Sequence, residues 1–217
     1  MAGLDRVRRL DEALTRRLAA WKSPRARQLL PAVESAAERT KLWWAVAALM
    51  AATGRKADRD AALSGLTSMI TADAASNLCK HLCERRRPPG RLIPHAGVHD
   101  RPHGSSFPSG HTAAAVGFAA AAAFRSPWTG ARAAVPAAMV AAERLQRGAH
   151  HPGDVAAGAA IGLTCAWLVH RHPGTRWAGR LTIRAAHATA VASGAVREAR
   201  AARAAGAARA ARRRPGR

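Results

Sequence analysis

The sequence is poor in acidic and aromatic side chains and contains no tyrosine. Its 217 residues include 13 Asp and Glu against 35 Lys and Arg, for a formal net charge of +22, and aromatic residues make up 4%. Runs of the β-branched and aromatic residues that form strands are largely absent. Hydrophobic residues still reach 48%, which excludes a wholly disordered polyelectrolyte, and 57 residues are the strong helix former alanine. The composition predicts one all-α domain.

Cysteines and signal-like segments are scarce as well. The three cysteines are too few for a disulfide framework and form no CxxC pair, so we expect reduced, packed thiols. The first twenty residues lack the apolar core of a secretory signal. Apolar residues instead recur there every three or four positions, which predicts an amphipathic helix on a membrane surface or on the rest of the protein. These residues are Leu4, Val7, Leu10, Leu14 and Leu18.

No apolar run reaches the roughly 18 residues of a clear transmembrane segment. Because Ala and Gly let helix backbones approach closely and Arg side chains reach toward headgroups, we nevertheless expect a polytopic membrane protein, a compact bundle of about five to six helices. A soluble bundle of Ala-rich helices is the alternative. Caps and breakers place helices near residues 4–21, 25–53, 58–82, 109–124, 131–147 and 153–171.

These helices divide the chain into an amphipathic N-terminal helix (1–24), a helical bundle (25–171) and a basic extension (172–217). The last 21 residues hold eight Arg and one Glu among Ala and Gly. We interpret this tail as a solvated extension, with contacts to anionic lipids or to nucleic acid as alternatives. No specific nucleic-acid partner is expected.

The segment 84–109 joins two of the predicted helices and is rich in Pro, Gly, Arg and His. A structureless stretch of this length in a compact protein is usually functional or disordered. His95 and His99, with His103, have spacing that a metal cluster could use. The prolines and the glycine among them argue against a helix, so a loop is favoured and no metal site is expected.

The motif KHLCERRRP starts inside a predicted helix and ends beyond it. Lys80 lies in the helix and Arg87 just past its end, so both cations can converge on one point. Arg85 and Arg86 are interpreted as solvated neighbours of Arg87. Fixed cations of this kind stabilise the non-bridging oxygens of a phosphate during phosphoryl transfer.

The motif SSFPSGHT places Ser109 at the start of the next predicted helix, where it can act as the cap. A helix N-terminus presents unpaired backbone N–H groups and the positive end of a dipole, which suit an anion such as phosphate. The amides around Ser109 and Gly110 are therefore candidate phosphate ligands. His111 follows in the first turn, next to any anion bound there.

The motif ERLQRGAHHPGD supplies Arg144, His150 and Asp154 at spacings of six and four. An unprotonated His150 can attack phosphorus and form a phosphohistidine, while a hydrogen bond from its other nitrogen to Asp154 would fix the tautomer. His111, on the leaving-group side, can protonate the departing alkoxide and later activate water. His151 is a second candidate nucleophile on spacing alone.

The three segments together resemble the signature of the type 2 phosphatidic acid phosphatase (PAP2) superfamily, whose pattern is KxxxxxxRP, PSGH and SRxxxxxHxxxD. Residues 80–88 and 108–111 match the first two motifs in full. Arg144, His150 and Asp154 match the third, but Glu143 replaces its leading Ser. We expect this replacement to alter local hydrogen bonding without loss of activity.

The resemblance implies a helical bundle whose three motifs meet on one side and form a phosphatase site without metal or cofactor. The implied catalytic residues are His150, His111 and Asp154, and the implied phosphate ligands are Lys80, Arg87, Ser109, Gly110 and Arg144. The implied protein is a small bacterial membrane enzyme with its site on the non-cytoplasmic face. Its substrate would be a phosphomonoester or diphosphate on a polyprenyl or phosphatidate-type lipid.

Three other functions remain open at this point. A soluble acid phosphatase would act on small phosphoesters, and a vanadate-dependent haloperoxidase would use a similar oxyanion pocket. A protein that binds anionic surfaces or nucleic acid would follow from the charge of +22 alone.

Overall fold

The computed structural model describes residues 2–20, 40–93 and 104–172, together with positions 29, 32, 33, 35–37 and 174. These residues are helical and include no strand, so the all-α prediction is confirmed. The helices are α1 (Ala2–Ala19), α3 (Lys41–Ala52), α4 (Lys56–Leu82), α5 (Gly110–Ala123), α6 (Pro127–Gln146) and α7 (Pro152–Arg171), with a 3₁₀ turn, η2, at Gly90–Leu92. Most of the predicted basic extension and the histidines at 95, 99 and 103 lie outside the described residues.

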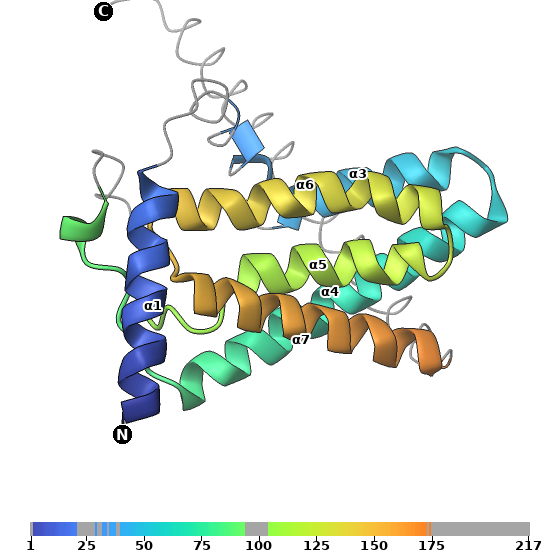
Figure 1. Cartoon of the computed structure of the whole chain (residues 1–217). Helices are drawn as coiled ribbons and strands as arrows, with labels where there is room; N and C mark the ends of the chain where they lie inside the picture. The colour runs from blue at the N-terminus through green and yellow to red at the C-terminus, as the bar shows by residue number, and fades with distance from the viewer. Residues whose placement is uncertain are drawn as a thin grey trace, which may run out of the picture. The chain divides into compact units, whose positions relative to one another are not determined.

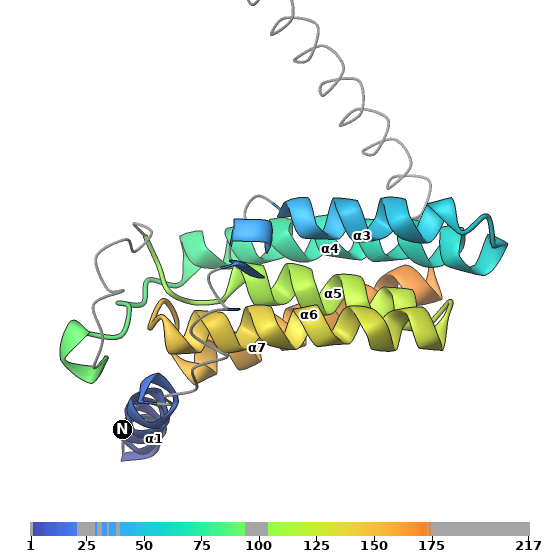
Figure 2. The same ribbon diagram turned by 90° about the horizontal axis from the view of Figure 1, so that it is seen from above.

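Helices α4, α5, α6 and α7 form the bundle, with α5 in contact with each of the other three (Figure 1). Ten of the 14 residues of α5 are buried, and six of these are alanines. Small side chains all round a helix allow neighbours to approach on every side, which explains how so apolar a helix takes the central position. Helix α3 packs on α4, on the side away from α7 (Figure 2).

Two glycines set the close approach of α5 and α7. A Cβ atom at Gly158 would lie 2.4 Å from the carbonyl oxygen of Ser109, and one at Gly162 would lie 2.6 Å from that of Ala113. Real Cβ atoms do not approach an oxygen so closely, so only glycine allows this separation. We call this contact of Gly158 and Gly162 with the backbone of α5 the glycine seam. It joins the segment that contains Ser109, in the second motif, to α7, the helix that begins within the third motif.

The tryptophan at position 43 belongs to the core. Trp43 is 2% exposed, and its ring lies 5.1 Å from that of Phe118 in a tilted arrangement. Phe118 is fully buried in α5, so the pair fastens α3 to the central helix.

Helix boundaries follow the predicted ones closely, apart from a break at Thr40 and an earlier start of α6. The helix expected over 25–53 is interrupted at Thr40, whose φ of 61° breaks the helical path, and α3 starts at Lys41. Of the positions expected before this break, those that the structure describes are helical, and the others lie outside the described residues. Helix α6 begins at Pro127, a few residues before the expected 131, since proline is well suited to the first helical turn.

Alternating helix directions bring all three motifs to one end of the bundle. The C-terminal ends of α4 and α6 meet the N-terminal ends of α5 and α7 there, as predicted (Figure 1). Helix α1 crosses this end and contacts α6, α7 and η2. Its last buried residue, Ala19, packs with Leu92 and Ile93. The amphipathic N-terminal helix thus lies on the bundle, beside the motifs.

Helix α7 is the one helix among the described residues that is both long and apolar enough to cross a membrane; α3 is apolar but has 12 residues. Large apolar side chains are also exposed over α3, α4, α6 and α7. They include Leu49, Leu78, Trp128, Val135, Leu163 and Trp167, with Trp128 81% exposed.

Candidate active site

His111 lies where the charged groups of all three motifs meet. Desolvation by the surrounding protein lowers the pKa of His111 to about 4, although the residue keeps an exposed edge, and four further groups act in the same direction. In decreasing order these are Arg144, His150, Lys80 and Arg87. The end of α4, the segment after it, the end of α6 and the loop before α7 therefore all place charge within reach of one imidazole. In the free protein His111 is neutral at pH 7.

The first motif is anchored at both of its cations. The Nη1 group of Arg87 donates to the carbonyl oxygen of Ala149 at 2.7 Å, which fastens the segment after α4 to the residue before His150. Lys80 lies against the start of α5, since a Cβ atom built on Gly110 would be 3.2 Å from its Nζ. Burial lowers the pKa of Lys80, while the carboxylate of Asp73 opposes this shift.

Ser109 caps α5 as predicted. Its Oγ accepts from the amide of Thr112 at 3.5 Å and lies 2.9 Å from the hydroxyl of Thr112. Its own amide, however, donates to the carbonyl oxygen of Asp154 at 3.0 Å. The prediction that the Ser109 amide binds phosphate is therefore not supported, because α7 already uses that donor. The amide of Gly110, the first residue of α5, remains a candidate phosphate ligand, because backbone N–H groups in the first turn of a helix have no partner within it.

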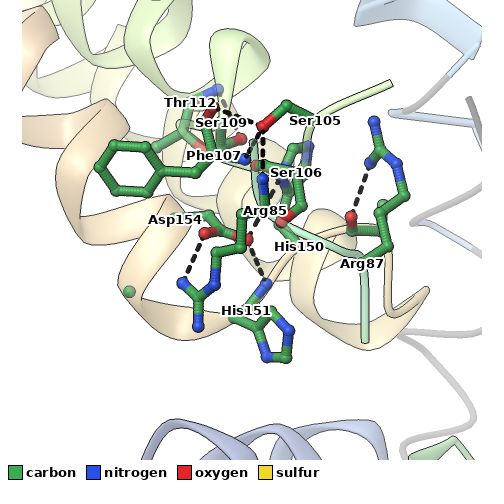
Figure 3. A network of polar contacts seen from close by, with 12 residues as sticks. Arg85, Arg87, Ser105, Ser106, Phe107, Ser109, Thr112, His150, His151 and Asp154 are labelled. Carbon is green, nitrogen blue, oxygen red and sulfur yellow. Dashed lines mark hydrogen bonds and ion pairs between the residues drawn. The ribbon is translucent and has the colours of Figure 1, made fainter. Parts of the chain in front are cut away.

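His150 is held in one tautomer by the backbone (Figure 3). Its Nδ1 lies 2.6 Å from the carbonyl oxygen of Ser106 and 3.8 Å from Oδ2 of Asp154. A carbonyl oxygen can only accept, so Nδ1 carries the proton and Nε2 keeps its lone pair. The expected hydrogen bond between His150 and Asp154 is thus replaced by a bond to Ser106, with the carboxylate close by. Burial lowers the pKa of His150, which keeps the ring neutral at pH 7.

Asp154 is completely buried and accepts two hydrogen bonds. Its Oδ2 accepts from the amide of His151 at 2.8 Å, and its Oδ1 accepts from Nη1 of Arg85 at 2.7 Å. The prediction that Arg85 is a solvated neighbour of Arg87 is wrong. No local signal marks its role, because its other partner is Asp11 on α1, which sequence analysis treated only as part of a polar helix face.

His151 faces α1. Its Nδ1 lies 3.4 Å from the hydroxyl of Thr15, which is itself buried and donates to the carbonyl oxygen of Asp11. In Figure 3 its ring points away from that of His150. His151 is also not among the groups that act on His111, whereas His150 is. Of the two candidate nucleophiles, the geometry favours His150.

Glu143 pairs with its neighbour in the third motif. The Nε group of Arg144 donates to Oε2 of Glu143, and both residues are 4% exposed. Arg147 lies 3.9 Å from the other carboxylate oxygen. Burial raises the pKa of Glu143, against the effect of Arg144. The departure from the family's Ser therefore places a carboxylate on a predicted phosphate ligand, a change of charge as well as of hydrogen bonding.

A cavity of about 260 Å³ opens beside His111 and Lys80. Its wall also includes Trp43, Asp73 and Asn77, so one side is aromatic and another is polar. Over the residues that the structure describes, no three His, Cys, Asp or Glu side chains gather as a metal site. The three cysteines are free thiols.

A sequence model of the PAP2 superfamily matches residues 61–178, more than half of the chain and all three motifs. Two solved structures are similar, each with a TM-score of 0.58. One is the first transmembrane PAP2 type phosphatidylglycerolphosphate phosphatase from Bacillus subtilis, at 22% identity over 77% of this chain and 86% of that one. The other is LpxE from Aquifex aeolicus, at 21% identity over 72% and 92% of the two chains. No curated protein matches. On the family match, supported by the fold of these two neighbours, this chain belongs to the PAP2 superfamily.

Proposed function

We propose that the protein is a membrane-associated phosphatase that hydrolyses a phosphomonoester or diphosphate on a polyprenyl or phosphatidate-type lipid. The observation that carries this proposal is the convergence of Lys80, Arg87, Arg144 and His150 on His111. Three cations around two neutral imidazoles match the needs of phosphoryl transfer, which depends chiefly on positioning and charge stabilisation.

The first step breaks the bond between phosphorus and the leaving oxygen. Nε2 of His150 attacks phosphorus, because the bond from Nδ1 to Ser106 leaves that lone pair free to react. His111 transfers a proton to the departing alkoxide. Its low pKa in the free protein means that the negative charge of bound substrate must raise its proton affinity first.

The second step releases phosphate. Water attacks phosphorus, His111 takes one of its protons, and the bond from phosphorus to Nε2 of His150 breaks. The electron pair returns to the imidazole, which restores the starting tautomer. Lys80, Arg87 and the Gly110 amide stabilise the phosphoryl oxygens in both steps, as does Arg144.

A lipid substrate is supported by the surface as well as by the family. Large apolar side chains reach the surface on several helices, and Leu49, Trp128 and Val135 are each more than half exposed. At the end of α7, Arg171 lies over Trp167 at 5.4 Å, an arrangement suited to a membrane interface. The two structural neighbours are described as a transmembrane phosphatidylglycerolphosphate phosphatase and as LpxE.

The test is phosphate release by the purified protein from a polyprenyl phosphate, a polyprenyl diphosphate, phosphatidate and a small soluble ester, with EDTA present. His150→Ala should abolish release from every substrate. His81→Ala is the matched control, because His81 is an exposed histidine in the last turn of α4 and should leave activity unchanged.

Release confined to lipids and lost in His150→Ala would support the proposal. Release from the small ester alone would replace it with a soluble-type acid phosphatase. Loss of activity in EDTA that a divalent ion restores would overturn the metal-free mechanism. Retained activity in His150→Ala would move the nucleophile to another residue, His151 first.

A further inference from the structure

Arg85 bridges two carboxylates that are far apart in the sequence. Its Nη1 donates to Oδ1 of Asp154 at 2.7 Å, and its Nη2 donates to Oδ2 of Asp11 at 2.5 Å. Asp154 belongs to the third motif, whereas Asp11 lies in the middle of α1. Arg85 occupies one of the variable positions of the first motif, and Asp11 lies outside all three motifs.

We propose that Asp11 and Arg85 form a positioning pair that makes α1 part of the active site, by holding Asp154 against His150. The proposal rests on the phosphatase function proposed above. The pair does not touch substrate; it acts on the reaction through Asp154.

The attachment of α1 is specific because it uses both oxygens of Asp11. While Oδ2 binds Arg85, Oδ1 accepts from the amide of Gly153 at 2.8 Å, in the first turn of α7. That amide has no acceptor inside its own helix, so Asp11 serves as an additional cap for α7. One turn further along α1, Thr15 lies 3.4 Å from Nδ1 of His151. Helix α1 therefore contacts His151 and Gly153 of the third motif directly, and Asp154 through Arg85.

The burial of these groups makes the bridge important. Asp154 is 0% exposed and Asp11 is 7% exposed, while the Arg85 side chain is 30% exposed. A buried carboxylate that loses its cation is strongly destabilised, because little water can replace the lost partner. Oδ2 of Asp154 is held by the amide of His151, whereas the side chain of Arg85 donates to Oδ1. Removal of Arg85 leaves that oxygen to turn toward another donor.

His150 lies beside this carboxylate, with its Nδ1 3.8 Å from Oδ2 of Asp154. The charged and titratable groups around His150 are Asp154 from α7, Arg87 from the segment after α4, and His111 from α5. Without Arg85, the full negative charge of Asp154 acts on the imidazole, and the pKa of His150 rises. A bridge with only a structural role would not produce this shift.

The experiment compares kcat, KM and the pH dependence of kcat/KM for Arg85→Met, Arg85→Lys, Asp11→Asn and Arg86→Met, all on one lipid phosphate. Ionisation of the substrate then affects every variant equally. Arg86 is the matched control, because it is the exposed neighbour of Arg85 and its side chain makes neither of the two carboxylate contacts. Thermal unfolding in detergent identifies variants that fail to fold.

Arg85→Met should lower kcat by roughly 10- to 100-fold with little change in KM, as for other residues that orient a catalytic group. The pH at which kcat/KM falls on the acidic side of the profile should rise by about half a unit or more, because the pKa of His150 rises. Arg85→Lys keeps the positive charge but cannot hold both carboxylates. Its kcat should fall less than that of Arg85→Met, and its kcat/KM should fall at the same acidic pH as in the wild type. Asp11→Asn should lower kcat without an upward shift, and in combination with Arg85→Met it should add nothing further.

The proposal would be overturned if a folded Arg85→Met protein kept the kcat and the pH profile of the wild type. It would also be overturned if kcat fell equally in Arg85→Met and Arg86→Met. Additive losses in the double variant would show that Asp11 does not act through Arg85. These outcomes are distinct from failure of the phosphatase function, which the His150→Ala comparison decides independently. If Arg85→Met does not fold, the pH profiles of Arg85→Lys and Asp11→Asn serve as the test. Both variants keep a positive charge at position 85, so a rise in the pH at which their kcat/KM falls would contradict the charge argument.

Discussion

The Nδ1 atom of His150 donates to the carbonyl oxygen of Ser106 at 2.6 Å, so the backbone of the second motif fixes the tautomer of the proposed nucleophile in the third. This arrangement divides two tasks that a single carboxylate often performs together. Ser106 holds the proton on Nδ1, and Asp154, at 3.8 Å, stabilises the positive charge that develops on the ring.

Asp154→Asn should therefore reduce kcat without abolishing it. Loss of the carboxylate removes charge stabilisation, yet Ser106 still presents the correct tautomer to the substrate. We expect a loss of roughly 10- to 100-fold, well short of that in His150→Ala. Steady-state phosphate release by the two variants at pH 7 checks this. Equal losses in both would show that Ser106 cannot hold the tautomer alone.

The pKa of His111 predicts how stability depends on pH. An unfolded imidazole has a pKa of 6.5, whereas His111 in the folded protein has one of about 4. Between these values the unfolded chain binds more protons, so the stability of the folded state falls as the pH drops from 6.5 toward 4. His150 and His151 act in the same direction, since both have lowered pKa values.

His111→Gln should flatten this dependence in part and lower kcat by about 10²- to 10⁴-fold, the usual contribution of a general acid. The measurements are the melting temperature in detergent at pH 7 and 4.5, and phosphate release at pH 7. A variant that melts with the same pH slope as wild type would contradict the shifted pKa. One that keeps full activity would remove His111 from the mechanism.

Glu143→Gln should tighten the binding of inorganic phosphate. The carboxylate beside Arg144 offsets the positive charge that attracts an anion, and the amide keeps an acceptor for Nε. Removal of the negative charge that lies against Arg144 should lower the inhibition constant for phosphate roughly three- to tenfold. Asp60→Asn, at the opposite end of α4, removes the same charge as a control. Unchanged inhibition in Glu143→Gln would show that Arg144 does not contact the phosphate.

Gly158→Ala should damage both packing and catalysis. The new Cβ would lie 2.4 Å from the carbonyl oxygen of Ser109, so α5 and α7 must separate. Overpacking of this kind typically costs about 1–3 kcal/mol of stability. The same shift stretches the bond from the Ser109 amide to Asp154 and should lower kcat. Gly174→Ala, which meets no atom within 4 Å, is the control in thermal unfolding and activity measurements.

The fold was predictable because its signals are local. Prolines, glycines and charged links mark the helix ends, and alanine content identifies the class, so α4 to α7 lie close to their expected bounds. The convergence of Lys80, Arg87, His111, Arg144 and His150 was also expected, since alternating helices bring their motifs to one end. Thr40 was missed, because a positive φ at threonine has no sequence signature.

The contacts that sequence analysis missed all join residues distant in the chain. Arg85 is one of three consecutive arginines, and its contacts with Asp154 of α7 and Asp11 of α1 distinguish it from Arg86. The Ser109 amide was expected to face phosphate, but the close seam with α7 directs it to Asp154. Ser106 carries no side-chain signal for its role, because the group that holds His150 is a backbone carbonyl.

The glycine seam has a consequence for substrate selection. Gly158 and Gly162 bring α7 directly against the backbone of α5, which leaves these two helices little room to change their spacing. In the proposed reaction α5 carries the acid, His111, and α7 follows the nucleophile, His150, so we expect little adaptation of the site to leaving groups of different size along this seam. The wall of the His111 cavity has other sides, where α3 contributes Trp43 and α4 contributes Asp73 and Asn77. We therefore expect variation in α3 to change the substrate without disturbing the proposed catalytic residues.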